Sequence, residues 1–268
     1  MTENREMKIG CCAPIDRYGE VAAAGFAHIE LPGSALARLS REELMQWERT
    51  VKDGPIPCRG LNSSIPQEVK ICGPMFSEEA ARQYARLLCA RAAQLGALNI
   101  GIGSPMSRTL PRGFSVETAW QQTEQFLRIF CAEALPYGIQ ILWEQVNTEE
   151  TNFGTDSLAS LPHVEKLVRE GLSNFGLIAD FYHMARMGED AAVALQVAPY
   201  VKHMHIAGVH NGRGHVTAED EAQMKPMFRA CAAGAQSISL EASHGSIGGE
   251  GAAARALLLR WLGEGESA

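Results

Sequence analysis

Short apolar runs alternate with amphipathic stretches along almost the whole of this chain. The runs are rich in apolar and β-branched residues and are bounded by glycine, proline or polar residues, a pattern typical of strands. We expect strands at residues 7–11, 27–31, 57–62, 98–102, 139–146, 175–180, 200–207 and 237–241.

Helical patterns with recognisable start and stop signals separate these runs. Ser40 and Glu43 form the two ends of a capping box, Ser77 and Ser115 are N-cap candidates, and Gly25 is a C-cap candidate. We expect helices at residues 18–24, 41–51, 78–94, 116–135, 156–170, 190–197, 219–231 and 252–262.

Strands that alternate with helices indicate parallel strand–helix–strand units. Eight such units in 268 residues favour a closed (β/α)₈ TIM barrel, with an open doubly wound sheet as the alternative. Because the sequence has no repeat, linker or break in composition, we expect a single domain over residues 1–268, with a short flexible tail at 263–268.

Composition and charge bear on compartment and partners. The net charge of −7 gives no broad attraction to nucleic acid or to an anionic membrane surface. The polar start of the chain does not resemble a secretory signal, and no apolar run approaches the ~20 residues that span a bilayer. Seven scattered cysteines without a C-x-x-C pair suit reduced thiols. We therefore expect a cytoplasmic protein that binds neither nucleic acid nor membrane.

The last four predicted strands each end on a carboxylate or an imidazole: Glu144, Asp180, His205 and Glu241. Because the carboxyl ends of barrel strands face one mouth, we expect these side chains to converge on one divalent metal ion. Three carboxylates and an imidazole favour Mn²⁺, with Mg²⁺ or Co²⁺ as alternatives and Zn²⁺ less favoured in the absence of a thiolate. His203 shares a strand face with His205; we favour His205 as the ligand because it lies nearer the carboxyl end.

At these residues the chain resembles the xylose-isomerase-like barrels, which include ketose 3-epimerases, hydroxypyruvate isomerase and inosose dehydratase. The matching motifs are E-x-x-N at 144–147, D-x-x-H-M at 180–184, H-x-H at 203–205 and the glutamate at 241. The resemblance implies a divalent-metal-dependent sugar isomerase or epimerase. It does not extend to the abasic-site endonucleases of this group, whose extra histidines after strands three and four are absent from LNSSIP and IGIGSP.

Roles for individual residues follow from the resemblance to ketose 3-epimerases. It implies that Glu144, Asp180, His205 and Glu241 bind the metal and that the two glutamates form an acid–base pair on opposite faces of the substrate. The residue that matches His183 contacts a substrate oxygen.

Other substrate contacts are less closely matched. Glu150, six residues after Glu144, is implied to lie beside the substrate, with the adjacent Glu149 as the alternative. Arg213 falls late for the substrate arginine of the epimerases, and His210 or His215 are alternatives to it.

The expected substrate is a small ketose or keto-polyol. A metal that chelates a carbonyl and the neighbouring hydroxyl acidifies the C–H between them and stabilises an enediolate. Return of the proton to the opposite face inverts the centre, transfer to the next carbon isomerises, and loss of a β-hydroxyl dehydrates as in an inosose-type dehydratase. A non-catalytic sugar-binding barrel is a further alternative. The sequence leaves the oligomeric state open, a homo-oligomer included.

Several polar residues also allow simpler interpretations. Asp180 is a candidate N-cap for a following turn. His28 and Glu30, on the second predicted strand, are interpreted as structural. Gly101 and Gly103 are interpreted as parts of a tight turn rather than of a phosphate-binding loop.

Overall fold

Eight parallel strands close into a barrel in the order β1 to β8 in the computed structural model, which describes residues 7–263. Pairing of β1 with β8, where Ile9 lies opposite Ile238, completes the ring. The closed barrel confirms the predicted fold and excludes the open sheet. The strands are β1 Lys8–Cys12, β2 Ile29–Pro32, β3 Cys58–Asn62, β4 Asn99–Ile102, β5 Gln140–Glu144, β6 Phe175–Asp180, β7 Val201–Ile206 and β8 Ser237–Leu240.

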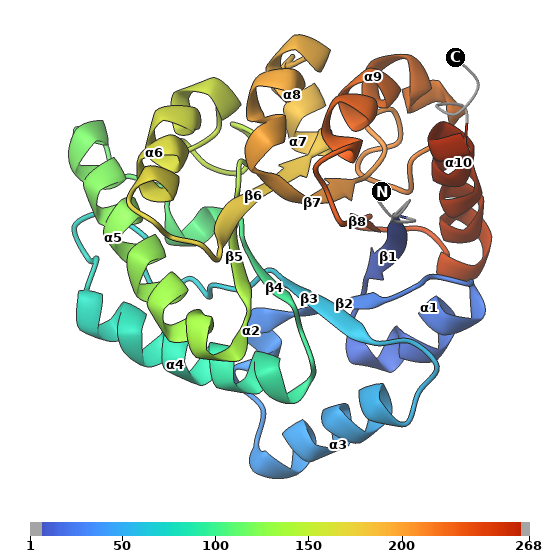
Figure 1. Ribbon diagram of the computed structural model, residues 1–268, viewed down its shortest axis with the longest axis horizontal. Helices are drawn as coiled ribbons and strands as arrows, with labels where there is room; N and C mark the ends of the chain where they lie inside the picture. Colours follow the sequence, from blue (N-terminus) through green and yellow to red (C-terminus); the bar gives the residue numbers. More distant parts are fainter. Residues whose placement is uncertain (1–6, 264–268) are drawn as a thin grey trace.

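Helices form an outer layer around the strands (Figure 1). Ser40 and Glu43 make the predicted capping box, and the side chains of Ser77 and Ser115 accept the N–H groups that they were expected to cap. The helices are α1 Tyr18–Ala23, α2 Gly33–Leu36, α3 Arg41–Lys52, α4 Glu78–Gln94, α5 Val116–Ala134, α6 Ser157–Arg169, α7 Phe181–Arg186, α8 Ala191–Val197, α9 Glu221–Ala232 and α10 Ala252–Gly263.

Two short helices were not expected, and the bounds of most strands differ by one or two residues from the sequence expectation. Both α2 and α7, of four and six residues, were missed, because helices this short show no helical period. The equally short α1 was predicted from its alanines and the following Gly25. The strand β5 stops at Glu144 and β8 stops at Leu240, so Glu241 is the first residue beyond its strand. Of the predicted tail, only Gly263 lies within the described residues.

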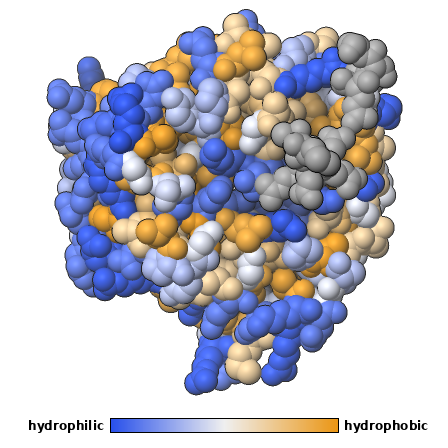
Figure 2. Space-filling view, viewed as in Figure 1, coloured by the Kyte–Doolittle hydropathy of each residue, from blue (hydrophilic) through white to orange (hydrophobic). Residues whose placement is uncertain are grey.

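Apolar side chains fill the barrel wall and the layer between strands and helices. On α5, the inward face buries Phe126 and Phe130, and on α3 only Leu44 and Val51 are buried. The outward side of α3, at the bottom of Figure 2, is mostly hydrophilic, as expected for an amphipathic helix on a barrel surface. Among the described residues, no helix combines the length and apolar character that crossing a bilayer requires.

Candidate metal centre

Four side chains from neighbouring strands meet at the carboxyl end of the barrel. Glu144 and Asp180 are the last residues of β5 and β6, His205 lies on β7, and Glu241 follows β8. One potential ligand atom from each lies within 4.8 Å of the other three. The Nδ1 atom of His205 is 2.9 Å from a carboxylate oxygen of Glu144 and 3.6 Å from one of Glu241. The structure therefore brings together all four residues that the strand-end pattern singled out.

The charges of this group are strongly coupled by burial. Burial, reinforced by the Glu144 carboxylate and opposed by His205, raises the pKa of Glu241 to about 7. Burial lowers the pKa of His205, but the carboxylates of Glu241 and Glu30 outweigh it and raise that pKa well above its usual value. Several buried carboxylates around one imidazole form an acidic pocket, which a divalent cation would neutralise. The donor set of three carboxylates and one imidazole suits such an ion.

The side chain of Asp180 has two separate tasks. Its Oδ1 atom accepts the N–H groups of Tyr182 and His183, at 2.8 and 3.2 Å, and so caps α7. Its Oδ2 atom lies 3.6 Å from the Nε2 atom of His183, on the side of the site. The capping interpretation is correct, and it leaves the second oxygen free to act as a ligand.

The orientation of His183 is set by the E-x-x-N motif. The backbone N–H of Asn147 donates to Nδ1 of His183 at 3.2 Å, and the Asn147 amide nitrogen lies 3.0 Å from the same atom. Its Nε2 atom lies 3.4 Å from Nη2 of Arg213, a group that can only donate a hydrogen bond. His183 also lines the cavity, where its ring could contact a substrate oxygen.

Arg213 reaches the site from the loop after β7. Its guanidinium donates to Glu150 at 2.8 Å and to Glu241 at 2.9 Å, and it lies 5.0 Å from the centre of the Tyr182 ring. Burial acts to lower the pKa of Arg213, but the carboxylates of Glu241 and Asp180 hold it above its usual range. Of the neighbouring acids, Glu150 lines the cavity, whereas Glu149 pairs with Arg186 at the surface.

The two alternatives to Arg213 lie elsewhere. His210 is half exposed and pairs with Asp220 at 2.8 Å. His215 lines different hollows, beside Glu250 and beside Cys12. Arg213 reaches the site despite its late position in the sequence. Its backbone is left-handed, with φ of +70°, and a hydrogen bond between the backbones of Gly208 and Gly214 closes the loop that carries it. Of the three candidates only Arg213 lines the cavity, which favours it over His210 and His215; its contact with substrate stays a prediction.

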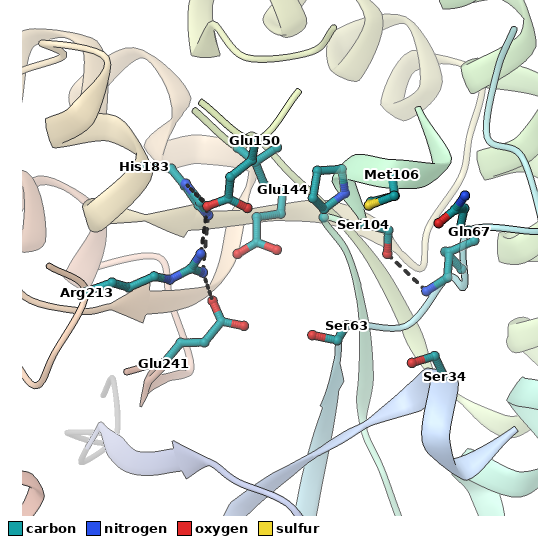
Figure 3. Close-up of a pocket in the computed structure, with 14 residues that line it drawn as sticks. Ser34, Ser63, Gln67, Ser104, Met106, Glu144, Glu150, His183, Arg213 and Glu241 are labelled. Carbon is teal, nitrogen blue, oxygen red and sulfur yellow. Dashed lines mark hydrogen bonds and ion pairs between the residues drawn. The ribbon is translucent and has the colours of Figure 1, made fainter. Parts of the chain in front are cut away.

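A cavity of about 340 Å³ opens beside the four strand-end residues. This volume is near the lower end of the range for small-molecule sites. Figure 3 shows charged side chains on one side of the cavity and neutral side chains on the other. The neutral residues include Ser34, Ser63, Gln67, Ser104 and Met106.

Sequence reasoning missed this neutral side and the glycine that borders the acids. Ser63 and Ser104 have positive φ angles of 44° and 40°, which no sequence pattern revealed. A Cβ atom at Gly103 would lie 2.3 Å from a carboxylate oxygen of Glu144, so the glycine makes room for that acid. The G-x-G stretch before Pro105 was interpreted only as a turn, but it was the one sequence feature that could have indicated this close approach.

The fold and the strand-end acids define the class: a TIM barrel with a carboxylate–histidine site at the carboxyl end of its strands. The chain belongs to the xylose isomerase-like TIM barrel family, which it matches over residues 19–261. Among curated proteins, none matches the chain significantly.

Solved structures share the fold at low sequence identity. L-ribulose 3-epimerase has a TM-score of 0.77 at 17% identity, with 96% of this chain and 95% of that chain covered. The 3-keto-D-glucoside 4-epimerase of E. coli in its apo form has a TM-score of 0.73 at 17% identity, covering 96% and 100%. A family 2 AP endonuclease from Brucella melitensis has a TM-score of 0.73 at 17% identity, covering 91% and 96%.

Proposed function

We propose that this protein is a divalent-metal-dependent sugar isomerase or epimerase that acts on a small ketose or keto-polyol. The observation that carries the proposal is the meeting of Glu144, Asp180, His205 and Glu241 beside a cavity large enough for a small molecule. The similarity to two epimerases of sugar substrates supports the choice of reaction.

Glu144, Asp180, His205 and Glu241 would hold the ion. Their three carboxylates and one imidazole favour Mn²⁺, with Mg²⁺, Co²⁺ or Zn²⁺ as alternatives. A divalent cation bound there would polarise a substrate carbonyl and acidify the neighbouring C–H. The remaining chemistry is proton transfer, which the side chains of this chain can perform.

Glu144 and Glu241 are the proposed acid–base pair. Both carboxylates border the same cavity, so a substrate carbon between them would present one face to each. One glutamate removes the proton and the other returns it to the opposite face, which inverts the centre. Return by the first glutamate to the adjacent carbon would instead interconvert a ketose and an aldose.

His183, Glu150 and Arg213 are the proposed substrate-binding residues. His183 contacts a substrate oxygen, and Glu150 accepts a hydrogen bond from a substrate hydroxyl. The guanidinium of Arg213 is anchored by Glu150 and Glu241 and lies 3.4 Å from Nε2 of His183, at the border of the cavity. Each of the three lines the cavity, which supports the assignment.

A sugar of this kind is the proposed partner, and a reducing compartment fits the remaining features. All seven cysteines are free thiols, and six of them are buried. Free buried thiols favour the cytoplasm. We infer a cytoplasmic enzyme without nucleic-acid or membrane partners, in keeping with its net charge of −7.

Solvent exchange tests the proposal. With Mn²⁺ and a panel of ketoses in D₂O, we expect deuterium to enter the carbon beside the carbonyl, and Glu241→Gln to abolish the exchange. Glu149→Gln is the matched control, because Glu149 is an exposed acid paired with Arg186 outside the cavity. Absence of exchange across the panel would contradict the proposal, and a UV-absorbing enone product would indicate a dehydratase instead.

A further inference from the structure

A cluster of buried polar side chains lies inside the barrel and shares His205 with the four strand-end residues. We call it the Glu30 cluster; none of its members is more than 1% exposed. Strand β2 contributes one of them and the residue directly before β2 is another, β7 contributes two and β8 one. The members are His28, Glu30, His203, His205 and Ser239.

Glu30 is the hub of this cluster. One of its carboxylate oxygens lies 3.3 Å from Nε2 of His205, and the other lies 2.6 Å from Nε2 of His203. The hydroxyl of Ser239 donates to the second oxygen and also lies 3.0 Å from Nε2 of His28. A single carboxylate therefore joins both histidines of the H-x-H motif.

Two glycines on neighbouring strands leave space for the cluster. A Cβ atom at Gly60 would lie 2.9 Å from the carboxylate of Glu30, and one at Gly10 would lie 2.1 Å from the ring of His28. The interior of a barrel of this type is usually packed with branched apolar side chains. Here glycines stand in place of branched apolar residues beside the polar cluster, so the barrel interior accommodates the cluster.

The two ring nitrogens of His205 face different partners. Nδ1 faces Glu144 and Glu241 at the proposed metal site, whereas Nε2 faces Glu30. A neutral imidazole has one N–H group and one lone pair, and a carboxylate can only accept a hydrogen bond. A proton shared with Glu30 must therefore be on Nε2, which leaves the lone pair of Nδ1 for a cation.

We propose that Glu30 is a positioning residue for the metal site: it holds the Nε2 proton and the ring plane of His205, so that Nδ1 is presented to the cation. The inference rests on the proposed function, because it needs a cation at that site. The proposal also gives the two histidines of the H-x-H motif different roles. His205 is the ligand, and His203, bonded 2.8 Å from Ser237, secures the other oxygen of Glu30.

The Mn²⁺ affinity of Glu30→Gln, measured by calorimetry on metal-free protein, tests this role without any turnover. Glutamine keeps the shape of the side chain, but its amide supplies one acceptor and one donor in place of two acceptors. Loss of a partner that orients a metal-bound histidine typically weakens binding roughly 10- to 100-fold. We expect a loss of that size while the circular dichroism spectrum is unchanged.

Ser237→Ala is the matched control. It removes the hydrogen bond to His203 at the far side of the cluster, and it leaves the contact between Glu30 and His205 in place. We expect Ser237→Ala to change thermal stability about as much as Glu30→Gln does, but to leave the affinity for Mn²⁺ unchanged. An equal loss of affinity in both variants would indicate general loosening of the barrel and would overturn the positioning role.

A measurement on the unmodified protein covers the case in which Glu30→Gln does not fold. In ¹⁵N-labelled protein loaded with diamagnetic Mg²⁺ or Zn²⁺, we expect long-range proton–nitrogen spectra to place the His205 proton on Nε2. A proton on Nδ1, or wild-type affinity in a folded Glu30→Gln, would overturn the inference alone. Failure of the wild-type protein to bind any divalent ion would overturn the metal site together with it.

Discussion

The two sides of the cavity differ in chemistry and in origin. The charged side comes from the segments after β5 to β8, and the neutral side comes from those after β2 to β4 (Figure 3). The charged side consists of Glu144, Glu150, His183, Arg213 and Glu241. The neutral side consists of Ser34, Ser63, Gln67, Ser104 and Met106.

In our proposal, the metal ligands and the acid–base pair all lie on the charged side of the cavity, and the neutral side can supply only further substrate contacts. Charged groups that meet at short distances can move protons and hold a cation, whereas neutral hydroxyl and amide groups can form hydrogen bonds with the polar groups of a substrate. The left-handed backbones of Ser63 and Ser104 are unusual for residues with a side chain, and such strain costs about 1–3 kcal/mol and clusters at functional sites. The backbone of the neutral side is therefore as specialised as the side chains of the charged one.

The largest effect is expected from a charged-side acid. Glu144→Gln removes both a proposed ligand and a proposed acid–base group, so kcat should fall by about 10³-fold, within the usual range for acid–base groups. Steady-state rates at saturating Mn²⁺ measure this. Glu170→Gln, at an exposed acid paired with Arg128, is the control and should retain full activity. Comparable activity in the two variants would contradict the assignment of Glu144.

A smaller loss is expected from Arg213→Met. The change keeps much of the length of the side chain but removes its charged hydrogen bonds to Glu150 and Glu241. One charged hydrogen bond to a substrate contributes about 1.5–3 kcal/mol, so its loss should lower kcat/KM roughly 10- to 100-fold. Arg186→Met, which removes a surface arginine paired with Glu149, should leave kcat/KM unchanged. An unchanged value in Arg213→Met would place this arginine outside the substrate site.

The pH dependence of stability should also distinguish the charged side. In metal-free protein, burial raises the pKa of Glu241 from 4.5 to about 7, so the folded state binds this proton more tightly than the unfolded state does. The stabilisation is present below pH 4.5 and is lost as the pH rises through 7. Glu241→Gln mimics the protonated form of this side chain, so its stability should not fall in this way as the pH rises.

Thermal unfolding of the two metal-free proteins checks this sign. Wild-type protein and Glu241→Gln should have similar melting temperatures at pH 5, and the wild-type value should be the lower one at pH 8. Added Mn²⁺ should remove the deficit of the wild type, because a ligand that binds only the folded state stabilises it by mass action. A wild-type protein that gains stability relative to Glu241→Gln between pH 5 and 8 would contradict the account of this acid.

The smallest effect is expected on the neutral side. Ser63→Ala and Ser63→Gly both remove a hydroxyl whose neutral hydrogen bond contributes about 0.5–1.5 kcal/mol, so KM should rise roughly two- to tenfold with kcat unchanged. Only glycine also relieves the left-handed backbone, so the glycine variant should melt higher than the alanine variant. A fall in kcat in both would show that this side takes part in the reaction.

Sequence pattern predicted the charged side better than the neutral one for a physical reason. Strand-end acids and histidines stand out because they follow apolar runs, and parallel strands bring such ends together. Serine and glutamine in loops carry neither period nor charge, and a positive φ angle at Ser63 has no signature in residue type. The order of eight strands was likewise readable from the sequence, whereas α7, whose six residues show neither a helical period nor an alanine-rich run, was not.

Polar contacts between residues far apart in the chain were also not predictable from the sequence. Glu30 was interpreted as structural because its partners, His203 and His205, lie far along the chain and only barrel closure brings them close. Arg213 was placed in doubt by its late position, since the compact fold of its loop depends on backbone hydrogen bonds between glycines. Arg213 is part of the charged side and Glu30 contacts one of its neighbours, His205, and only the three-dimensional structure reveals these contacts.

The anomalous difference density of a crystal soaked in Mn²⁺ tests the central claim most directly. We predict one strong peak within coordination distance of Glu144, Asp180, Glu241 and the Nδ1 atom of His205, with open positions on the side of the cavity. A peak elsewhere, or no peak among these four side chains at saturating Mn²⁺, would contradict the account.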